Sequence, residues 1–486
     1  MNDDKAREEC GVVALCTGVP DVAALDDAAL GDAARDDAAR EAFYALFSLQ
    51  HRGQESAGIA SADGKRISMH KGLGLVSGAF SEGDIESLRG GIAIGHTRYS
   101  TTGEPSVRNA QPFYVETMHG PLALAHNGNL VNAGALRRGL LERGVGLSSS
   151  SDTEVMVMML AAAPGATWPE RIAACMREWQ GAFSFAVLTR DAVFAARDPW
   201  GFRPLCAGSL PKGGSAAASE TCALQTLGCH DPRDIEPGRI VELCPQGPVD
   251  RGGIEPSERR ASCVFEYVYF SRPDSVWNGA QVHEARRRFG AALAREAPAE
   301  ADVVIAVPDS SISAAIGYSQ ASGLPYDEGF AKNRYIGRTF IQPTQALREL
   351  GVALKFNAMP GTVRGKRVVV VDDSIVRGTT TGPLVRLLRE AGAASVHVRI
   401  SCPPIRHPCY MGVDMGSRDG LIAHRLSIEE IRKTVGADSL SYLSLGGMMQ
   451  ALKDSGGSGG FCKACFSGDY PLDIVGAAGK NGFEVI

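Results

Sequence analysis

The sequence contains no run of about eighteen apolar residues and no strong excess of either charge. The first absence excludes a membrane-spanning helix, which needs about 20 consecutive apolar residues. The net charge is only -5 over 486 residues and the pI is about 6.1, which argues against nucleic acid as a general partner. Residues 1–9 are polar and lack the apolar core of a secretory signal. We therefore expect neither a membrane nor a nucleic acid to be a partner.

Cysteine is sparse as well, with 12 residues scattered along the chain. This number is too small for a disulfide scaffold, so the reducing cytoplasm is the expected location.

What the sequence does have is length and apolar content. With 486 residues and 44% hydrophobic composition, it can build about three units of roughly 150 residues, each with its own core.

One segment near residue 370 has the pattern of a sugar-phosphate site. Four valines at 368–371 predict a strand that is buried on both faces of a parallel sheet. Asp372 and Asp373 follow, and a loop at 377–381, rich in Gly and Thr, precedes a helix that starts near Gly382. Backbone N–H groups at such a helix start favour phosphate, and paired carboxylates can accept hydrogen bonds from ribose hydroxyls or hold Mg²⁺. The alternative is that the two aspartates simply end a core strand.

This stretch resembles the phosphoribosyl pyrophosphate loop of type I phosphoribosyltransferases. Its longer form, VVVVDDSIVRGTTT, resembles that of the glutamine phosphoribosylpyrophosphate amidotransferase family. The resemblance implies that the substrate is bound by Asp372, Asp373, Ser374, Arg377, Gly378, Thr379 and Thr380. It also implies a mobile basic loop at 332–339 that closes over pyrophosphate through Lys332, Arg334 and Arg338, although composition alone equally describes a solvated turn. Mg²⁺ would be held by Ser310, Asp372 and Asp373.

The same family begins with a glutaminase whose nucleophile is an N-terminal cysteine. Here Cys10 follows the polar residues 1–9, which resemble a propeptide, and opens an apolar run that predicts a buried strand. Cleavage before Cys10 would free an α-amine with a pKa of about 7.7–8.0, suited to take the proton of a thiol with a pKa near about 8.5. Taken alone, Cys10 would be read as a small core residue.

Four motifs downstream occur in the order found in N-terminal-nucleophile amidotransferases. They are HRGQ at 51–54, GHTRYS at 95–100, HNGN at 126–129 and SDTE at 151–154. Glutamine needs a cation for its carboxylate, an anion for its amine and donors for the oxyanion. The resemblance assigns these roles to Arg98, to Asp152, and to Asn127 with the Gly128 N–H. The histidines of these motifs are interpreted as structural, and Arg52 as a packing or gating residue.

A third set of residues points to a metal cluster. Cys462 and Cys465 form a C-x-x-C after a flexible Gly/Ser stretch, and two more thiolates would complete a four-ligand site. Four thiolates can hold zinc or a 4Fe-4S cluster, and spacing does not separate the two. The contexts of Cys263 and Cys409 resemble the ligand positions of the iron-sulfur branch of the family, which favours a structural 4Fe-4S cluster. His407 is an alternative to Cys409.

These observations predict an α/β enzyme of two catalytic units. Residues 1–9 form a propeptide, 10–238 an αββα N-terminal-nucleophile glutaminase sandwich, 263–436 an α/β type I phosphoribosyltransferase and 437–486 a C-terminal segment with cluster ligands. The resemblance implies an amidophosphoribosyltransferase that makes phosphoribosylamine, the first step of purine synthesis, with a homotetramer and inhibition by purine nucleotides. An ammonia channel is expected, which Tyr267, Tyr269 and Phe270 could line, although packing is equally consistent with them.

Two other functions remain open at this point. One is a nucleotide-sensing regulator that keeps the phosphoribosyltransferase fold, and the other is a different amidotransferase of the same N-terminal-nucleophile class. A sensor has no use for the glutaminase motifs, and the segment 368–381 fits neither an ATP-binding nor a sugar-isomerase domain. An Ala/Asp-rich insert at 21–40 is expected to be a marginal surface helix or disordered.

Overall fold

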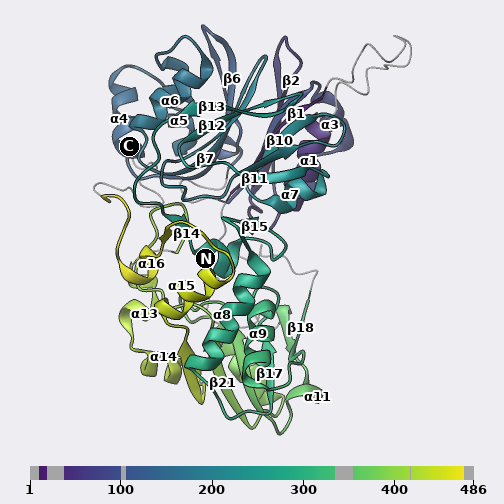
Figure 1. Ribbon diagram of the computed structural model, residues 1–486, viewed down its shortest axis with the longest axis vertical. Coiled ribbons are helices and arrows are strands. Elements are labelled where there is room, and N and C mark those ends of the chain that lie inside the picture. The colour runs from purple at the N-terminus through teal and green to yellow at the C-terminus, as the bar shows by residue number, and fades with distance from the viewer. Residues whose placement is uncertain (1–9, 19–37, 100–105, 334–353, 416–417, 475–486) are drawn as a thin grey trace.

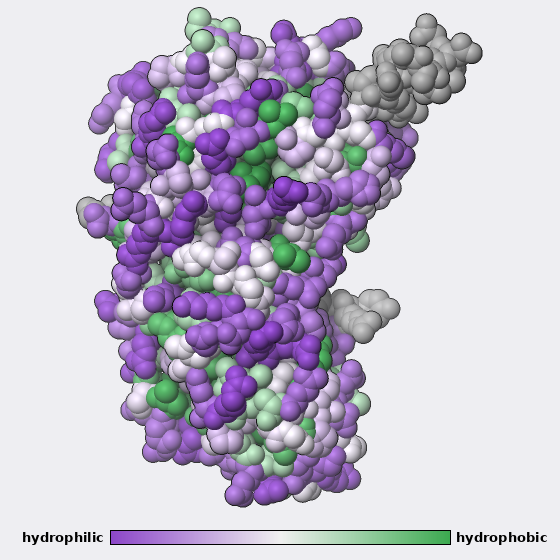
Figure 2. All heavy atoms as spheres, viewed as in Figure 1, coloured by the Kyte–Doolittle hydropathy of each residue, from purple (hydrophilic) through white to green (hydrophobic). Residues whose placement is uncertain are grey.

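The computed structural model describes residues 10–18, 38–99, 106–333, 354–415 and 418–474 (Figure 1). The predicted propeptide at 1–9, most of the Ala/Asp-rich insert, Arg334 and Arg338 lie outside these residues. The chain forms two lobes, and the C-terminal segment lies where they meet (Figure 1). Figure 2 shows a mostly hydrophilic face, on which apolar residues occur in small separate groups. Among the described helices, none combines the length and apolar character that crossing a membrane requires.

The first lobe contains a seven-stranded antiparallel sheet in which β1 (Gly11–Thr17) lies at the centre. The order of its strands is β11-β9-β10-β1-β4-β2-β3. Besides β1, these strands are β2 (Ser56–Ala62), β3 (Ile67–Leu73), β4 (Ile92–Arg98), β9 (Cys206–Ser209), β10 (Gly214–Ala218) and β11 (His230–Asp234).

Helices α1 (Ala38–Ser48) and α7 (Thr221–Thr226) pack on the outer face of this sheet, with the short α2 (Val76–Ala79) and α3 (Glu82–Ser87) beside them. Alanines at 38, 39, 42 and 45 face the sheet and are buried, which lets α1 approach it closely. The start of α1 therefore includes the end of the Ala/Asp-rich insert, at residues 38–40.

A second antiparallel sheet packs against the inner face of the first. Its six strands run in the order β13-β12-β8-β7-β6-β5. They are β5 (Phe113–Thr117), β6 (Gly120–Leu130), β7 (Gly181–Thr189), β8 (Val193–Arg197), β12 (Arg239–Cys244) and β13 (Gly247–Gly253). Helices α4 (Ala133–Glu142), α5 (Asp152–Ala162) and α6 (Trp168–Glu178) cover its outer face and complete an αββα sandwich.

The sandwich does not end at residue 238, where the sequence analysis placed its boundary. Strands β12 and β13 follow that position, and β12 pairs with β8 inside the second sheet. The sheet therefore needs residues up to Gly253 to be complete. Pro237 and Gly238 lie in the connection from β11 of the first sheet to β12 of the second.

The second lobe is built on a parallel sheet of four strands in the order β17-β20-β21-β22. They are β17 (Val303–Ala306), β20 (Arg367–Asp372), β21 (Ser395–Ile400) and β22 (Ser439–Tyr442). The four valines of β20 are buried, as predicted for a central strand of a parallel sheet. Helices α8 (Val282–Glu296) and α9 (Ile312–Ser322) pack together, and α12 (Thr381–Glu390) contacts β21.

Smaller elements complete the second lobe and the C-terminal segment. They are β14 (Ser262–Cys263), a π-helical turn (Glu266–Phe270), β15 (Val276–Trp277), β16 (Ala280–Gln281), β18 (Phe330–Lys332), β19 (Phe356–Ala358), α11 (Pro360–Val363), α13 (Ile422–Arg425), α14 (Ile428–Val435), α15 (Leu445–Asp454), β23 (Phe461–Cys462) and α16 (Ala464–Ser467). Single 3-10 turns lie at Val107–Asn109 and Arg418–Gly420. Strand β14 pairs in parallel with β23 and so ties the C-terminal segment to the start of the second lobe.

Candidate functional site: a thiol pocket and a carboxylate pocket

Strand pairing brings Cys10 beside Arg98. Gly11 lies opposite Thr97 in the antiparallel pair of β1 and β4, so the residues that flank this pair, Cys10 and Arg98, are at the same edge of the sheet. Cys10 is buried, and its Sγ donates a hydrogen bond to the Tyr99 carbonyl oxygen at 3.4 Å. Two residues that the sequence analysis singled out from different motifs are therefore neighbours.

Charged side chains surround the Cys10 thiol. Arg98 Nη1 lies 3.7 Å from Glu55 Oε2. Asp152 is the first residue of α5, and its Oδ2 accepts a hydrogen bond from the Leu130 N–H at 3.1 Å. Burial raises the pKa of Cys10 to about 11, while Arg98 lowers it and the carboxylates of Glu55 and Asp152 raise it. The thiol is therefore protonated at neutral pH and needs a base to become a nucleophile.

Asn127 presents a hydrogen-bond donor that has no acceptor. The side chain is buried on β6, and its Nδ2 has no hydrogen-bond partner among the described residues. Buried polar groups are nearly always paired, so such a donor is suited to hydrogen-bond an oxygen of a ligand. The next residue, Gly128, has φ +146°, and a Cβ there would lie 1.9 Å from the Ala182 carbonyl oxygen. Glycine is thus required beside this donor.

The three motif histidines support the structure around this pocket. The His96 ring hydrogen-bonds the His126 carbonyl oxygen through Nε2 at 3.0 Å, and burial lowers the pKa of His96 to about 3. His126 Nδ1 lies 3.8 Å from Asp152 Oδ2. His51 Nε2 is 2.7 Å from Glu220 Oε1. These contacts agree with the interpretation of the histidines as structural residues.

The second pocket lies at the carboxyl end of β20. Asp372 and Asp373 are both buried there, among hydroxyl groups. Ser311 Oγ donates to Asp372 Oδ1 at 3.0 Å, Ser374 Oγ donates to Asp373 Oδ1 at 2.6 Å, and Ser310 Oγ also hydrogen-bonds Asp373. Ser310 therefore reaches the carboxylate with which it was predicted to share Mg²⁺. Carboxylate and hydroxyl oxygens are a donor set that fits Mg²⁺.

The loop after these carboxylates leads into α12, as predicted. Gly378 has φ +78°, and the buried Thr379 hydroxyl has no hydrogen-bond partner within the described parts of the chain. A hydroxyl of this kind at a helix start suits a phosphate oxygen. From the predicted basic loop, Lys332 forms an ion pair with Asp309, whereas Arg334 and Arg338 lie outside the described residues. The structure thus brings Lys332 to the same edge of the sheet as Ser310.

The four cysteines predicted as cluster ligands line one cavity between the lobes. Cys263 and Cys462 lie opposite each other in the β14–β23 pair, and Cys465 follows at α16. The lining also includes Cys409, together with mainly apolar residues: Phe202, Phe265, Tyr410, Met411, Val413, Met415, Ala464 and Tyr470. Burial raises the pKa of Cys465 well above its usual value, and the neighbouring Cys263, Cys462 and Cys409 raise it further. By contrast, the ring of His407 lies against Gly468.

The described residues contain no group of three or more Cys, His, Asp or Glu side chains arranged to hold a metal ion. Four thiolates are a donor set that both zinc and a 4Fe-4S cluster use, and the four cysteines that line this cavity are compatible with either.

Sequence reasoning missed several residues of these sites. Ser311 is hydrogen-bonded to Asp372 but was not distinguished from its neighbour Ser310. Glu220 and Glu266 are fully buried and both pair with Arg52, which was assigned a packing or gating role without a partner. A lone glutamate inside the apolar run VFEYVYF was the available signal, since buried carboxylates are rare unless paired.

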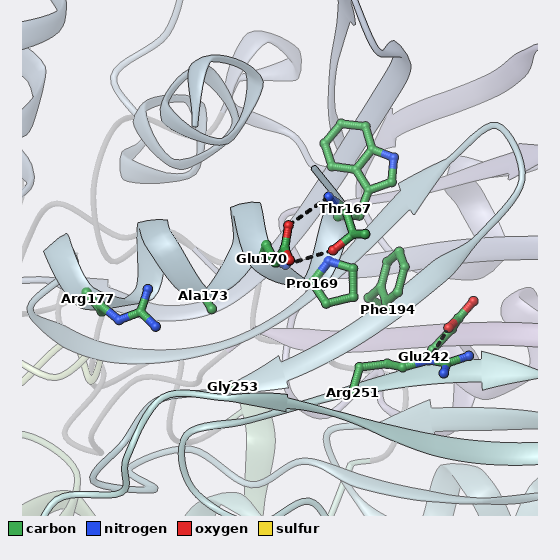
Figure 3. A pocket seen from close by; sticks show the side chains of 10 residues that line it. Thr167, Pro169, Glu170, Ala173, Arg177, Phe194, Glu242, Arg251 and Gly253 are labelled. Carbon is green, nitrogen blue, oxygen red and sulfur yellow. Dashed lines mark hydrogen bonds and ion pairs between the residues drawn. The ribbon is translucent and has the colours of Figure 1, made fainter. Parts of the chain in front are cut away.

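One surface pocket of the first lobe lies away from both sites. It has a volume of about 670 Å³ and lies between α6 and the strands β8, β12 and β13 (Figure 3). Two pairs of its polar side chains interact, since Glu170 caps α6 through Thr167 and Arg251 pairs with Glu242 (Figure 3). The residues that line it are different from those predicted for catalysis or binding.

Comparison with known protein families agrees with this division into two sites. Residues 96–226 match the model of a glutamine amidotransferase domain, and residues 278–415 match that of a phosphoribosyl transferase domain. The chain is 47% identical to the amidophosphoribosyltransferase of Synechococcus elongatus over 97% of its own length and 93% of that protein. It is 50% identical to that of Archaeoglobus fulgidus, over 90% and 95% of the two chains.

Solved structures give the same result. The structure of glutamine phosphoribosylpyrophosphate amidotransferase from Bacillus subtilis, complexed with ADP and GMP, matches with a TM-score of 0.85 and 45% identity. The match covers 96% of this chain and 98% of that one. A structure described as the allosteric regulatory enzyme of purine biosynthesis matches with a TM-score of 0.88 and 43% identity, over 98% and 99% of the two chains.

Proposed function

The chain belongs to the amidophosphoribosyltransferase family, and from this premise we propose how its own residues carry out the reaction. It is a glutamine amidotransferase and pentosyltransferase of purine biosynthesis. Glutamine and phosphoribosyl pyrophosphate are its substrates, and phosphoribosylamine, glutamate and pyrophosphate are its products. The observation that carries the residue assignment is the position of the buried Cys10 opposite Arg98 at the end of the β1–β4 pair, with the charges of Arg98, Glu55 and Asp152 around its thiol.

The glutaminase step uses Cys10 as the nucleophile. Removal of residues 1–9 frees its α-amine, which takes the thiol proton as the sulfur attacks the side-chain amide carbon of glutamine. Arg98 holds the substrate carboxylate and Asp152 its α-amine. Asn127 Nδ2 and the Gly128 N–H donate to the oxyanion. The C–N bond then breaks, the nitrogen leaves as ammonia, and water hydrolyses the Cys10 thioester to give glutamate.

The transferase step takes place at the carboxyl end of β20. Asp372 and Asp373 accept hydrogen bonds from the ribose hydroxyls, and the loop of Ser374, Arg377, Gly378, Thr379 and Thr380 holds the 5-phosphate through N–H and hydroxyl donors. Lys332, with Arg334 and Arg338 from the same loop, binds pyrophosphate. Ammonia attacks ribose C1 while the bond from C1 to the pyrophosphate oxygen breaks. Mg²⁺ held by Ser310, Asp372 and Asp373 would neutralise charge on the departing pyrophosphate.

Cys263, Cys409, Cys462 and Cys465 would hold a 4Fe-4S cluster with a structural role. The support is their position around one apolar cavity, where Cys409 and Met411 also contact the first lobe through a shared apolar cluster. Bound there, the cluster would tie the C-terminal segment to both lobes.

All 12 cysteines are free thiols in the structure, which is in keeping with a reducing compartment such as the cytoplasm.

We further propose a homotetramer that purine nucleotides inhibit. The support comes from a relative: the Bacillus subtilis enzyme, 45% identical to this chain, was solved in complex with ADP and GMP. Equilibrium binding of GMP to the purified protein, together with its mass in solution, tests both statements. A monomer, or a protein that does not bind GMP, would contradict the corresponding statement.

The experiment that tests the proposed function is a product balance. With glutamine and phosphoribosyl pyrophosphate present, glutamate and pyrophosphate should form in a ratio of about one to one.

The intact mass, measured with and without acid, tests both the removal of residues 1–9 and the presence of a 4Fe-4S cluster. Loss of residues 1–9 together with an acid-labile mass of iron and sulfide supports both. A mass that still includes residues 1–9 would contradict the proposal that the Cys10 α-amine acts as the base. An acid-labile mass equal to that of zinc would contradict the proposed 4Fe-4S cluster.

A further inference from the structure

Arg52 and Glu266 form a fully buried ion pair that joins the two lobes. Arg52 follows α1 in the first lobe, and Glu266 begins the π-helical turn of the second. Arg52 Nη2 lies 2.7 Å from Glu266 Oε1, and Nη1 lies 3.0 Å from Oε2. Neither side chain is exposed at all. Two parallel N–H···O bonds between a guanidinium and a carboxylate define the orientation of both groups.

The same guanidinium also holds the backbone of Cys10. Arg52 Nε donates a hydrogen bond to the Cys10 carbonyl oxygen at 3.0 Å. Its Nη1 additionally donates to Glu220 Oε1 at 2.6 Å. Because a guanidinium is planar and rigid, the two carboxylates that hold its Nη atoms also determine where Nε points. The position of the Cys10 peptide therefore depends on Glu266, a residue of the other lobe.

Glu266 is in turn fixed within the second lobe. Ser271 Oγ donates to Glu266 Oε2 at 2.6 Å. Arg286, on α8, donates from Nε to the Tyr267 carbonyl oxygen at 2.7 Å and from Nη2 to the Ser271 carbonyl oxygen at 2.9 Å. The turn that carries Glu266 is thus held at both of its ends by side chains of its own lobe. These hydrogen bonds fix the position of the Glu266 carboxylate that pairs with Arg52.

We infer that Glu266 is a positioning residue of the glutaminase reaction, supplied to the Cys10 site by the phosphoribosyltransferase lobe. The inference rests on the proposed function of Cys10. After cleavage, Cys10 carries both nucleophile and base, so its orientation depends on how its carbonyl group is held. Glu266 does not touch glutamine and acts through Arg52. Small displacements of a reacting group cost about 100-fold in rate, so loss of this support should lower the rate of glutamine cleavage.

The test is the Glu266→Gln variant, which keeps the size of the side chain but removes its charge. Its kcat with glutamine should fall about tenfold to 100-fold. The KM for glutamine should stay within about twofold, because Arg98 and Asp152 are unchanged. Synthesis from ammonium salts should keep its wild-type kcat, since this reaction does not use Cys10. A merely structural role would lower both reactions together.

A second variant keeps the test decisive if Glu266→Gln does not fold, since breaking a buried ion pair is strongly destabilising. Ser271→Ala keeps the charge and removes only the hydrogen bond to Glu266 Oε2. It should lower kcat with glutamine by a smaller factor and leave the ammonium reaction unchanged. If the variant that folds keeps the wild-type kcat with glutamine, or loses both reactions equally, the inference is overturned.

Asp234→Asn serves as the matched control. Asp234 also joins the lobes, since its Oδ2 accepts a hydrogen bond from the Asn278 N–H at 2.7 Å. This contact is separate from the hydrogen bonds of Arg52 described above. The control should retain both activities, and a selective loss of glutamine use in it would refute the special role of Glu266. Cys10→Ala separates the two claims: if it keeps glutamine turnover, the proposed nucleophile fails, whatever Glu266 does.

Discussion

Gly412 packs directly against Gly128, although the two residues belong to different lobes. A Cβ built on Gly412 would lie 2.9 Å from the Gly128 carbonyl carbon. Nearby, Asn129 Nδ2 donates to the Tyr410 carbonyl oxygen at 3.0 Å. The loop that contains Cys409 is therefore in contact with the strand that carries the proposed oxyanion donors. The cavity lined by the four cysteines is therefore adjacent to this part of the glutaminase lobe.

This contact predicts the effect of Gly412→Ala. The new methyl group would push against the Gly128 backbone and shift the oxyanion donors, so kcat with glutamine should fall about tenfold to 100-fold. Activity with ammonium salts should remain. Gly144→Ala is the matched control, because Gly144 also has a positive φ, of +77°, but a Cβ there would meet no other described atom within 4 Å. Equal losses in the two variants would show that backbone strain alone is responsible.

Asn127→Ala tests the oxyanion donor itself. Removal of one such donor costs about 100-fold to 1,000-fold in kcat. The KM for glutamine should change little, because the donor acts on charge that develops only in the transition state. Steady-state kinetics with glutamine, beside Asn132→Ala as a control at the N-terminal cap of α4, give the comparison. A rise in KM at constant kcat would instead make Asn127 a substrate-binding residue.

Asp373→Asn tests the carboxylate pocket. A hydrogen bond to a charged group contributes about 1.5–3 kcal/mol, so KM for phosphoribosyl pyrophosphate should rise about tenfold to 100-fold. This effect should be the same with glutamine and with ammonium salts, since both reactions use this substrate. Asp302→Asn is the control, because Asp302 pairs with Arg367 at the opposite end of the same strand. An unchanged KM in Asp373→Asn would place the substrate elsewhere.

Cys465→Ala tests the cluster. The purified variant should lose most of its iron, which is expected at about four atoms per chain in the wild type, together with its acid-labile sulfide. Its Tm should fall because the C-terminal segment loses its tie to the second lobe. Cys402→Ala is a close control: this thiol is also buried, and it raises the pKa of Cys465, but it does not line the cavity. If Cys465→Ala keeps the wild-type iron content, Cys465 is not a ligand of the cluster.

The sequence predicted best those features that lie within one short segment. The four valines before Asp372 and Asp373 form the buried parallel strand that their β-branched, apolar character indicated. The helix after the Gly/Thr loop begins at Thr381, one residue before the expected start. Cys10 opens a buried central strand, as its apolar run indicated. In each case, local pattern and burial agree, so no distant partner was needed to infer the structure.

Features that depend on distant partners could not be derived from the sequence. Glu266 is a single glutamate in an apolar run, and only the folded chain shows that Arg52 neutralises it. The boundary at 238 was placed too early, since only the folded chain shows that β12 pairs with β8 of the same lobe. Tyr267, proposed for a channel, is stacked on Trp277 with ring centroids 5.5 Å apart, and its role in a channel stays a prediction.

The central claim is that Cys10 generates the ammonia that the phosphoribosyltransferase site consumes. Its most direct test is pyrophosphate release by Cys10→Ala, measured once with glutamine and once with an ammonium salt as nitrogen source. We predict that release with glutamine is abolished and that release with ammonium continues near the wild-type rate. Continued glutamine-dependent release by this variant would contradict the account.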